Sequence, residues 1–466
     1  MAFLVDEFCT TMGVLVHENY SCVLNLADVQ KNSNKFYILQ LLVSSDKKSF
    51  FVYSRYGRVG EKGVSTTKQF VSVDATIKEF INKYKLKTGC VWGSKTNNKP
   101  GKYANIEIEV LDTTLDIKQQ NVEIQGSVLD EKIQKMIEEM VDRKSISKTF
   151  KLFNIDEKKL PLGKISSQQI QKANTILKDI EDNIKLKKDV TNLSSEFWTL
   201  VPYATGRNKP PPIIGTLECV KSYADFLDML KNLQVTSKII NLNIKEIYDS
   251  LGLELVPLDR NSLEWSIIEK YVSKTHGITH NYVLELEEII EIKEIDLENK
   301  IMNSPKTKRS NSKNSNSCLL FHGSRTFNFI GILKEGLRIP GLSQVVNGAA
   351  LGRGIYFADC VTKSFNYCSD TQGYILLSEV NLGENPDFVN ASCTNINNTF
   401  TSKIAEGRYT PKSDEFLKIH DVIVPCGTLI ESTSQFRKQS SFIYNEYVIY
   451  NQEHYKPKYL LKLKKK

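Results

Sequence analysis

The nine cysteines of this 466-residue chain are scattered, and no two of them have the Cys-x-x-Cys spacing. This absence argues against a zinc finger and a disulfide framework, and it is typical of a protein from a reducing compartment. No apolar run approaches the length that a membrane-spanning helix needs. The first twenty residues contain Asp6, Glu7 and Glu18, so they lack the apolar core of a signal peptide. We therefore expect a soluble protein that holds no metal and has no membrane partner.

Two glycine-rich nucleotide-binding motifs are missing as well. The glycines of Gly57–Gly63 have the order G-x-x-G-x-x-G, and the residues after them do not predict a helix. A dinucleotide-binding loop has the order G-x-G-x-x-G and opens a helix after a strand. Gly93–Thr96 contains lysine and threonine but lacks the earlier glycine of a phosphate-binding loop. The sequence thus argues against a Rossmann site and against a P-loop.

The chain does contain enough apolar residues for several cores. Hydrophobic residues make up 41% and charged residues 25%, a balance typical of globular proteins, and the length predicts three domains. The formal net charge of +8 permits a polyanionic partner, although a basic chain more often has only a solvated surface. The lysine-rich residues Leu461–Lys466 leave the same two alternatives open, a contact with a polyanion or a frayed, solvated tail.

Residues before about 118 predict a mixed α and β structure. Phe36–Val43 and Ser49–Tyr53 are rich in aromatic and branched residues and are separated by a turn-like segment, as in a pair of strands. Val73–Tyr84 has apolar residues at helical spacing. We expect Asp74 to cap this helix and Gly89 to end it.

From about residue 125 the apolar spacing becomes helical. Leu129–Val141 has one apolar face, and a second helix is predicted to start at Ser166, with Gln169 completing a capping box. A third helix covers Phe226–Leu233. Successive amphipathic helices joined by polar or proline-rich turns predict an all-helical bundle.

After about residue 245 the pattern is mixed again, with a helix predicted over Leu263–Val272. Short apolar runs predict the strands Cys318–Phe321, Ile355–Phe357, Tyr374–Val380, Val422–Val424 and Tyr447–Tyr450. Asn299–Ser317 is poor in apolar residues and predicts an exposed loop. Its cluster Lys306–Arg309 is a weak candidate for a nuclear-import signal, and a solvated insertion is the simpler interpretation.

Three short segments of the last third carry an unusual His, Tyr and Glu. They are Leu319–Arg325 around His322, Gly352–Asp359 around Tyr356, and Tyr444–Tyr447 around Glu446. In order and approximate spacing they resemble the catalytic signature of the poly(ADP-ribose) polymerase family, with which Lys363-Ser364 and Tyr367 also coincide. Each segment alone is unspecific, whereas three in register are a strong signal. The resemblance implies an enzyme that consumes NAD.

The resemblance also implies how the site is built. His322 would hydrogen-bond the adenosine ribose of NAD, and the Gly323 backbone and the Ser364 hydroxyl would grip the carboxamide of the nicotinamide. Tyr356 and Tyr367 would stack on the two faces of the nicotinamide ring. The further NAD-binding residues implied in this way are Ser324, Arg338 and Ala358.

The chemical task is to break the bond between nicotinamide and ribose, which leaves positive charge on the ribose, as in glycoside hydrolysis. Glu446 lies among apolar residues, where an unpaired carboxylate is costly, so a functional role is the better explanation. By resemblance, Glu446 would polarise the ribose, stabilise the cation and activate the acceptor hydroxyl, with Lys363 assisting on the acceptor side. The implied catalytic residues are then His322, Tyr356, Glu446 and Lys363.

The first domain resembles a WGR domain over about residues 25–110. Tyr56–Gly60 carries a tyrosine where the name-giving tryptophan belongs, and Lys87–Trp92 and Lys99–Tyr103 match two further signatures. In that family the domain binds DNA ends and relays the signal to catalysis. The resemblance implies that Arg58 contacts phosphate and that Tyr56 stacks on a base or sugar. A purely structural hairpin is the alternative.

The middle domain resembles the helical regulatory domain of the same family, on Leu160–Ser166 and Phe197–Pro202. This implies an autoinhibitory lid that screens the NAD site until DNA is bound. We therefore expect a mixed α+β WGR domain at 1–118, an all-α regulatory bundle at 122–242 and an α+β ADP-ribosyltransferase domain with antiparallel sheets at 246–466. Without zinc fingers ahead of the first domain, the chain resembles the short, DNA-break-sensing members.

The predicted activity is NAD-dependent poly-ADP-ribosylation of proteins, stimulated by broken DNA ends, in the nucleus and in DNA repair. The expected acceptors are the enzyme itself and chromatin proteins. Two departures from the family pattern keep alternatives open: Ala349 replaces an aromatic residue that stacks on NAD, and the sequence lacks an aromatic extension after Leu461. The alternatives are a mono-ADP-ribosyltransferase and a catalytically silent scaffold that binds DNA ends.

Overall fold

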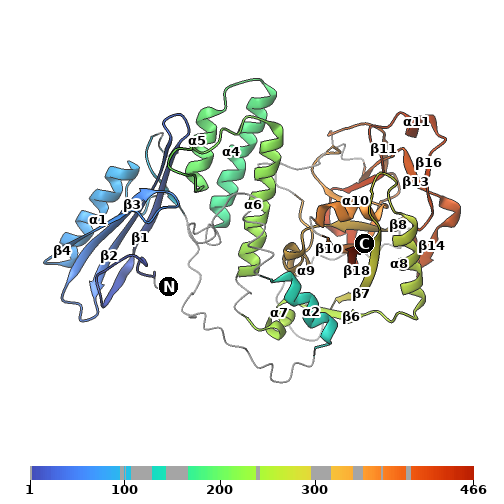
Figure 1. Cartoon of the computed structure of the whole chain (residues 1–466), viewed down its shortest axis with the longest axis horizontal. Helices are drawn as coiled ribbons and strands as arrows, with labels where there is room; N and C mark the ends of the chain where they lie inside the picture. The colour runs from blue at the N-terminus through green and yellow to red at the C-terminus, as the bar shows by residue number, and fades with distance from the viewer. Residues whose placement is uncertain are drawn as a thin grey trace. The chain divides into compact units, whose positions relative to one another are not determined.

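The computed structural model describes residues 3–94, 99, 101–106, 129–142, 166–237, 242–294, 316–339, 350–368, 371–394 and 400–466 (Figure 1). The chain divides into two compact units. Unit 1 comprises Met1–Asn121, Arg143–Gln234 and Leu342–Asn347, and unit 2 comprises Val122–Asp142, Val235–Gly341 and Gly348–Lys466. The import candidate Lys306–Arg309, Ala349 and residues 160–165 of one regulatory signature lie outside the described residues. Among the helices described, none is long and apolar enough to cross a membrane.

Unit 1 contains a five-stranded sheet in the order β4-β3-β2-β1-β5, with antiparallel pairing throughout these strands. Its strands are β1 (Val14–Asp28), β2 (Ser33–Ser44), β3 (Phe50–Arg58), β4 (Val64–Phe70) and β5 (Ala104–Ile106). The helix α1 (Val73–Thr88) packs on this sheet, where Phe80 and Tyr84 are buried with Leu24 and Leu39. The two strands predicted here are confirmed as parts of β2 and β3.

The ends of α1 follow from local chemistry, with one correction to the prediction. The hydroxyl of Ser72, and not the carboxylate of Asp74, accepts the backbone N–H of Ala75 at 3.3 Å. Ser72 has the extended backbone of a capping residue, whereas Asp74 already lies in the first turn, where its charge favours the helix dipole. Gly89 ends the helix as predicted, with a φ of +72° that glycine adopts readily.

Of the described helices of the middle segment, α4 (Ser167–Lys185), α5 (Thr191–Leu200) and α6 (Leu217–Ser237) belong to unit 1, except that α6 passes into unit 2 from Val235 on. Ser166 caps α4 by accepting the backbone N–H of Gln169 at 3.1 Å. The predicted capping box is wrong in its second half, because the Gln169 side chain donates to the carbonyl of Leu200 at 3.0 Å. This bond ties α4 to the end of α5, against which it packs.

Unit 2 is built on a seven-stranded sheet in the order β14-β15-β8-β10-β18-β7-β6. Its strands are β6 (Leu253–Pro257), β7 (Leu284–Glu294), β8 (Ser317–Gly323), β10 (Gln372–Asn381), β14 (Leu417–Ile419), β15 (Val422–Val424) and β18 (Tyr455–Lys465). The helix α8 (Leu263–Lys274) packs on it through Ile268 and Tyr271, and the Tyr271 hydroxyl donates to the carbonyl of Leu319 at 3.0 Å.

A smaller sheet of unit 2 carries two of the three segments singled out in the sequence. It consists of β11 (Asp387–Val389), β12 (Ser402–Ala405), β17 (Glu446–Ile449) and β9 (Ile355–Phe357), in that order. β13 (Tyr409–Pro411) pairs with β16 (Leu429–Glu431). The short helices nearby are α9 (Phe329–Glu335), α10 (Val361–Phe365) and α11 (Gln435–Lys438). Most pairings of unit 2 are antiparallel, as predicted, and the β11–β12 and β15–β8 pairs are parallel.

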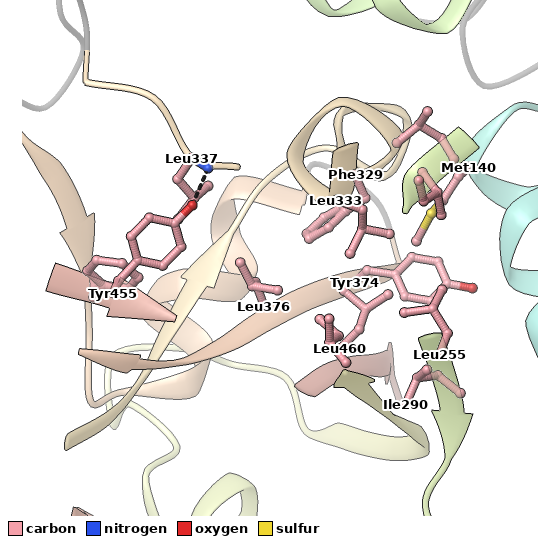
Figure 2. Packing of buried hydrophobic residues seen from close by; sticks show 14 of the residues in the cluster. Met140, Leu255, Ile290, Phe329, Leu333, Leu337, Tyr374, Leu376, Tyr455 and Leu460 are labelled. Carbon is pink, nitrogen blue, oxygen red and sulfur yellow. Dashed lines mark hydrogen bonds between the residues drawn. The ribbon is translucent and has the colours of Figure 1, made fainter. Parts of the chain in front are cut away.

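Two helices of the middle segment belong to unit 2, namely α2 (Glu131–Met140) and α7 (Ile244–Leu251). The buried side chains of α2 belong to the same core cluster as residues of the large sheet. Figure 2 shows Met140 of α2 beside Phe329, Leu333 and Tyr374. The helical middle segment is therefore divided between the two units.

The strand β18 excludes one of the two alternatives given for the lysine-rich residues Leu461–Lys466. It lies inside the large sheet, paired with β10 on one side and β7 on the other. Leu461 stands opposite both Ile375 and Ile289, and Leu460, Leu461 and Leu463 are fully buried. Most of the lysine-rich tail is thus an interior strand, and the alternative of a frayed, solvated tail is wrong.

Candidate active site

Backbone hydrogen bonds bring the three segments together in unit 2. Phe321 of β8 and Ala358, which follows β9, exchange two backbone hydrogen bonds of 2.8 and 2.9 Å. β9 in turn pairs with β17, with Tyr356 opposite Val448. His322, Tyr356 and Glu446 therefore stand on three adjoining strands, although they are far apart in the sequence.

The half-buried His322 is oriented by its neighbour strand. Its Nδ1 lies 2.9 Å from the carbonyl oxygen of Tyr356. A carbonyl only accepts, so Nδ1 carries the hydrogen and Nε2 is the acceptor in the neutral ring. Burial lowers the pKa of His322, while the bond to Tyr356 acts in the opposite direction. The side chain thus presents a hydrogen-bond acceptor at neutral pH.

Gly323 makes room for the backbone of α10. A Cβ at this position would lie 1.8 Å from the carbonyl oxygen of Ser364, so no other residue fits without moving the helix. The Ser364 hydroxyl donates to the carbonyl of Phe321 at 3.1 Å. That hydroxyl oxygen keeps lone pairs with which it can accept from an amide. The predicted carboxamide-gripping groups, the Gly323 backbone and Ser364, are therefore close together.

The two predicted stacking tyrosines differ in how they are held. The hydroxyl of Tyr356 donates to the carbonyl of Gly352 at 2.7 Å and accepts the backbone N–H of Leu351 at 3.0 Å. Burial raises the pKa of Tyr356, and the nearby carboxylate of Glu446 adds to the rise. Tyr367, by contrast, is 59% exposed. One ring is fixed and the other is open to solvent.

Glu446 forms an ion pair that the sequence argument did not include. Its Oε1 lies 2.8 Å from Nζ of Lys363, and both side chains are about one-fifth exposed. Lys363 also donates to the carbonyls of Tyr444 and Asn445, at 3.3 and 3.1 Å. The partner of Glu446 comes from α10, which belongs to another segment of the chain. The predicted pair of a carboxylate and a helper lysine is brought together.

The remaining predicted NAD contacts are placed less uniformly. Ser324 accepts the side-chain amide of Asn328 at 2.9 Å. Ala358 is buried, and its backbone is engaged by β8. Arg338 forms an ion pair with Glu335 near the end of α9. The structure brings Ser324 and Ala358 next to the central residues through β8.

Three residues beside the predicted ones were given no role by the sequence argument. Asp359 is buried and accepts hydrogen bonds from Asn445 and Tyr447, at 2.6 and 2.9 Å. A signal was present, because Asp359 follows directly on the apolar run Ile355–Ala358, where a carboxylate is costly. Its partners could not be read from the sequence, since they belong to a distant segment.

The two predicted DNA-binding residues lie in unit 1, on β3. Tyr56 is 41% exposed and stacks on Tyr37, with ring centres 5.6 Å apart. Arg58 donates to the backbone and side-chain oxygens of Asn32, at 2.9 and 2.7 Å. It also donates to the Thr205 hydroxyl at 3.0 Å and to the Lys209 carbonyl at 2.8 Å. The ring is open to solvent, and the guanidinium is engaged within the unit.

Within the described ranges, no group of three or more His, Cys, Asp and Glu side chains could hold a metal ion. Comparison with known families gives three matches that follow one another along the chain. Residues 20–99 match the WGR domain, residues 127–260 the poly(ADP-ribose) polymerase regulatory domain, and residues 262–465 the poly(ADP-ribose) polymerase catalytic domain. The expected succession of three domain types is confirmed.

Several curated relatives resemble the chain along nearly its whole length. Poly [ADP-ribose] polymerase 1 of Gallus gallus is 34% identical over 465 residues, which cover 96% of this chain and 45% of the relative. Poly [ADP-ribose] polymerase of Drosophila melanogaster is 32% identical, with 96% and 46% covered. Poly [ADP-ribose] polymerase 2 of Arabidopsis thaliana is 30% identical, with 99% and 76% covered. The chain thus spans about half the length of the animal relatives.

Proposed function

The chain belongs to the poly(ADP-ribose) polymerase family, and we propose that it transfers ADP-ribose from NAD to proteins and extends the product into a polymer. NAD supplies the ADP-ribosyl group and leaves nicotinamide as the second product. It is consumed as a substrate, and no metal is needed. The relatives carry this activity in their names, and the residues of the candidate site support it for this chain.

The groups around Gly323 suit the nicotinamide end of such a substrate. A peptide group both donates and accepts, and the Ser364 hydroxyl accepts, which matches the two hydrogen-bonding sides of a carboxamide. The ring of Tyr356, fixed by two hydrogen bonds, suits one face of the nicotinamide ring, and the exposed Tyr367 suits the other. Nε2 of His322 is an acceptor that suits a ribose hydroxyl.

The observation that carries the proposal is the ion pair of Glu446 and Lys363, 2.8 Å apart, beside the strand of Tyr356. Negative charge fixed next to a ribose stabilises the positive charge that develops as nicotinamide leaves. The same carboxylate can take the proton of an acceptor hydroxyl. Lys363, held by two carbonyls, keeps the carboxylate in one position. Glu446 therefore both stabilises charge and serves as a general base.

Glu446→Gln tests this role, because it keeps the shape of the side chain and removes its charge. We expect kcat for nicotinamide release to fall by about 10²- to 10⁴-fold with little change in KM for NAD. Glu379→Gln is the matched control, since Glu379 is also half-buried and lysine-paired, with Lys458 at 3.2 Å, and lies on β10. Equal losses of affinity and turnover would contradict the assignment.

The product is tested on a gel of the self-modified protein with labelled NAD. A ladder supports polymer formation, and a single band supports the mono-ADP-ribosyltransferase instead. Protein that shows neither band nor nicotinamide release would be the catalytically silent scaffold. The three candidate functions are therefore separated by two measurements on one preparation.

Regulation by broken DNA, in the nucleus and in repair of chromatin, completes the proposal. The domain ranges 1–118, 122–242 and 246–466 would act as DNA reader, lid and catalyst. Support comes from the WGR match and from Tyr56, whose exposed ring suits stacking on a base or sugar. Arg58 is engaged with Asn32 and Lys209, so a DNA phosphate would have to replace these partners. Acceptors would include the enzyme itself and chromatin proteins.

A further inference from the structure

Asp359 is the most deeply buried carboxylate near the candidate site, with 1% of its surface exposed. Its Oδ2 accepts two hydrogen bonds, from the Asn445 side-chain amide at 2.6 Å and the Tyr447 hydroxyl at 2.9 Å. These are the residues on either side of Glu446. In an extended chain, neighbours on both sides of a residue project to the opposite face from it. Asp359 therefore holds β17 by two hydrogen bonds on one face of the strand, and the side chain of Glu446 points to the opposite face.

The partners of Asp359 are themselves fixed. Oδ1 of Asn445 accepts the backbone N–H of Gly407 at 2.9 Å and a guanidinium N–H of Arg437 at 2.8 Å. With its oxygen engaged by two donors, the Asn445 amide can turn only its NH₂ group toward Asp359. Arg437 is held in turn by Glu406 at 2.6 Å. The hydrogen bond from Asn445 to Asp359 can therefore form in only one orientation of the amide.

The position of Asp359 in the chain adds a second connection. It lies between β9, which carries Tyr356, and α10, which carries Lys363 and Ser364. One buried residue thus joins the elements that supply the stacking tyrosine, the lysine and the carboxylate of the candidate site. A shift of Asp359 would move Glu446 relative to Lys363.

This arrangement carries a cost that packing alone does not explain. Among the described residues, Oδ1 of Asp359 has no hydrogen-bond partner. Burial raises the pKa of Asp359, and the bonds from Asn445 and Tyr447 and the charges of Lys363 and Arg437 act in the opposite direction. A buried carboxylate with one oxygen unsatisfied destabilises a fold relative to an apolar residue of similar size.

We propose that Asp359 is a positioning residue that fixes Glu446 against Lys363 through the two neighbours of Glu446. The inference rests on the proposed function, in which Glu446 acts on the substrate. It assigns to Asp359 no contact with NAD. The geometry predicts that loss of the two hydrogen bonds to Asp359 lowers kcat and leaves KM for NAD nearly unchanged. Glu446 would move, while the nicotinamide-binding groups on β8 would stay in place.

The experiment uses Asp359→Asn, Asn445→Asp and the two changes together in the full chain. Asp359→Asn weakens the hydrogen bonds from Asn445 and Tyr447, because it removes the charge of the accepting carboxylate. Asn445→Asp places two carboxylates next to each other, which repel. The double variant restores a donor facing an acceptor, with the charge placed beside Arg437. We expect kcat to fall about 10-fold and about 100-fold in the single variants, by analogy with small misplacements of catalytic groups, and to recover largely in the double variant.

Two further readouts separate positioning from a merely structural role. In a Glu446→Gln background, Asp359→Asn should lower the residual rate no further, because its effect passes through Glu446. A crystal structure of Asp359→Asn should show the Lys363–Glu446 distance increased. The proposal is overturned if the double variant does not recover, if the losses add in the Glu446→Gln background, or if the ion pair is unchanged. If the unaltered protein releases no nicotinamide, the proposed function fails, and the crystal structure still decides on positioning.

Discussion

Two helices of the same regulatory match, α2 and α5, are attached to their surroundings by opposite kinds of contact. α2 contacts the large sheet of unit 2 through the apolar side chains Ile133, Met136, Ile137 and Met140. α5 contacts the sheet of unit 1 through hydrogen bonds. The side-chain amide of Asn25 on β1 donates to the carbonyls of Trp198 and Thr199, at 2.8 and 3.0 Å.

The difference teaches which part of the middle segment can separate from its sheet. Burying four such apolar side chains contributes about 6–12 kcal/mol, as an upper estimate, and nothing in water replaces it. A neutral hydrogen bond contributes only about 0.5–1.5 kcal/mol, because water offers an alternative partner. α2 is therefore a fixed part of the core of unit 2, whereas the contact of α5 with β1 depends on the geometry of its hydrogen bonds.

The largest expected effect comes from two deletions with the same flexible linker. Removal of residues 122–242 takes α2 away and uncovers the core around Tyr374. The loss of about 6–12 kcal/mol is comparable with the whole stability of a domain, so we expect unit 2 to lose its cooperative melting transition. Removal of residues 143–234 keeps α2 and should melt cooperatively. Calorimetry distinguishes the two.

The shorter deletion also tests the proposed lid. If α4–α6 screen the NAD site, this variant should release nicotinamide without DNA, since the catalytic groups are untouched. A folded variant whose nicotinamide release still requires DNA would contradict the proposal that α4–α6 screen the NAD site. Equal melting of both deletions would instead show that α2 is dispensable to the catalytic unit.

A single substitution sharpens the same point. Ile137→Ala removes a side chain of α2 that is fully buried, and we expect it to destabilise unit 2 by about 2–5 kcal/mol. Lys135→Ala, two residues away on the exposed side of α2, is the control and should change the stability by less than about 0.5 kcal/mol. Urea titration measures both. Similar values for the two would mean that α2 is not part of this core.

Glu139 is the polar exception on α2. It accepts the Tyr374 hydroxyl at 2.6 Å and pairs with Lys462 at 2.7 Å. Glu139→Leu should cost about 1–3 kcal/mol, because Lys462 is nearly buried and loses its nearer carboxylate, which leaves Glu287 at 3.8 Å among the described ion-pair partners. Glu139→Gln keeps an acceptor for Tyr374 and should cost less. Denaturant midpoints in the reverse order would contradict this account.

An effect on stability no larger than that of Glu139→Leu is expected for Asn25→Ala, which removes the two bonds that Asn25 makes to α5. We expect a loss of about 1–3 kcal/mol at this contact, since two buried carbonyls lose their donor. If α5 relays the DNA signal, stimulation by DNA should fall while the rate without DNA stays the same.

Arg207→Ala is the matched control for Asn25→Ala. It removes an exposed ion pair with Glu61 in the same unit and should change nothing measurable. Nicotinamide release, measured with and without broken DNA, provides the readout for both variants. If DNA stimulates the Asn25→Ala variant as strongly as the unaltered protein, the contact of β1 with α5 does not transmit the DNA signal.

Sequence reasoning succeeded where the signal is local. The apolar spacing of Leu263–Val272 lies within α8, and the branched run Phe36–Val43 lies within β2. It failed where the partner is remote. The ion pair of Glu446 with Lys363 was not predicted, because Lys363 belongs to another segment, and contacts across segments leave no mark in local periodicity.

The lysine-rich tail shows the same limit. Its alternating leucines and lysines fit a solvated tail as well as a strand, and only pairing with β10 and β7 decides between them. The choice of Asp74 over Ser72 as a cap was a local error, since both residue types cap helices and the boundary was misplaced by two residues.

The central position of β18 sets a time order for biosynthesis. A ribosome makes this strand after every other strand of the large sheet, yet β10 and β7 contact each other only through it. Until residues 455–465 have left the exit tunnel, the nascent sheet is two separate ribbons with exposed edges, which are prone to wrong pairing. A message truncated before this point would yield a chain that cannot assemble the large sheet of unit 2.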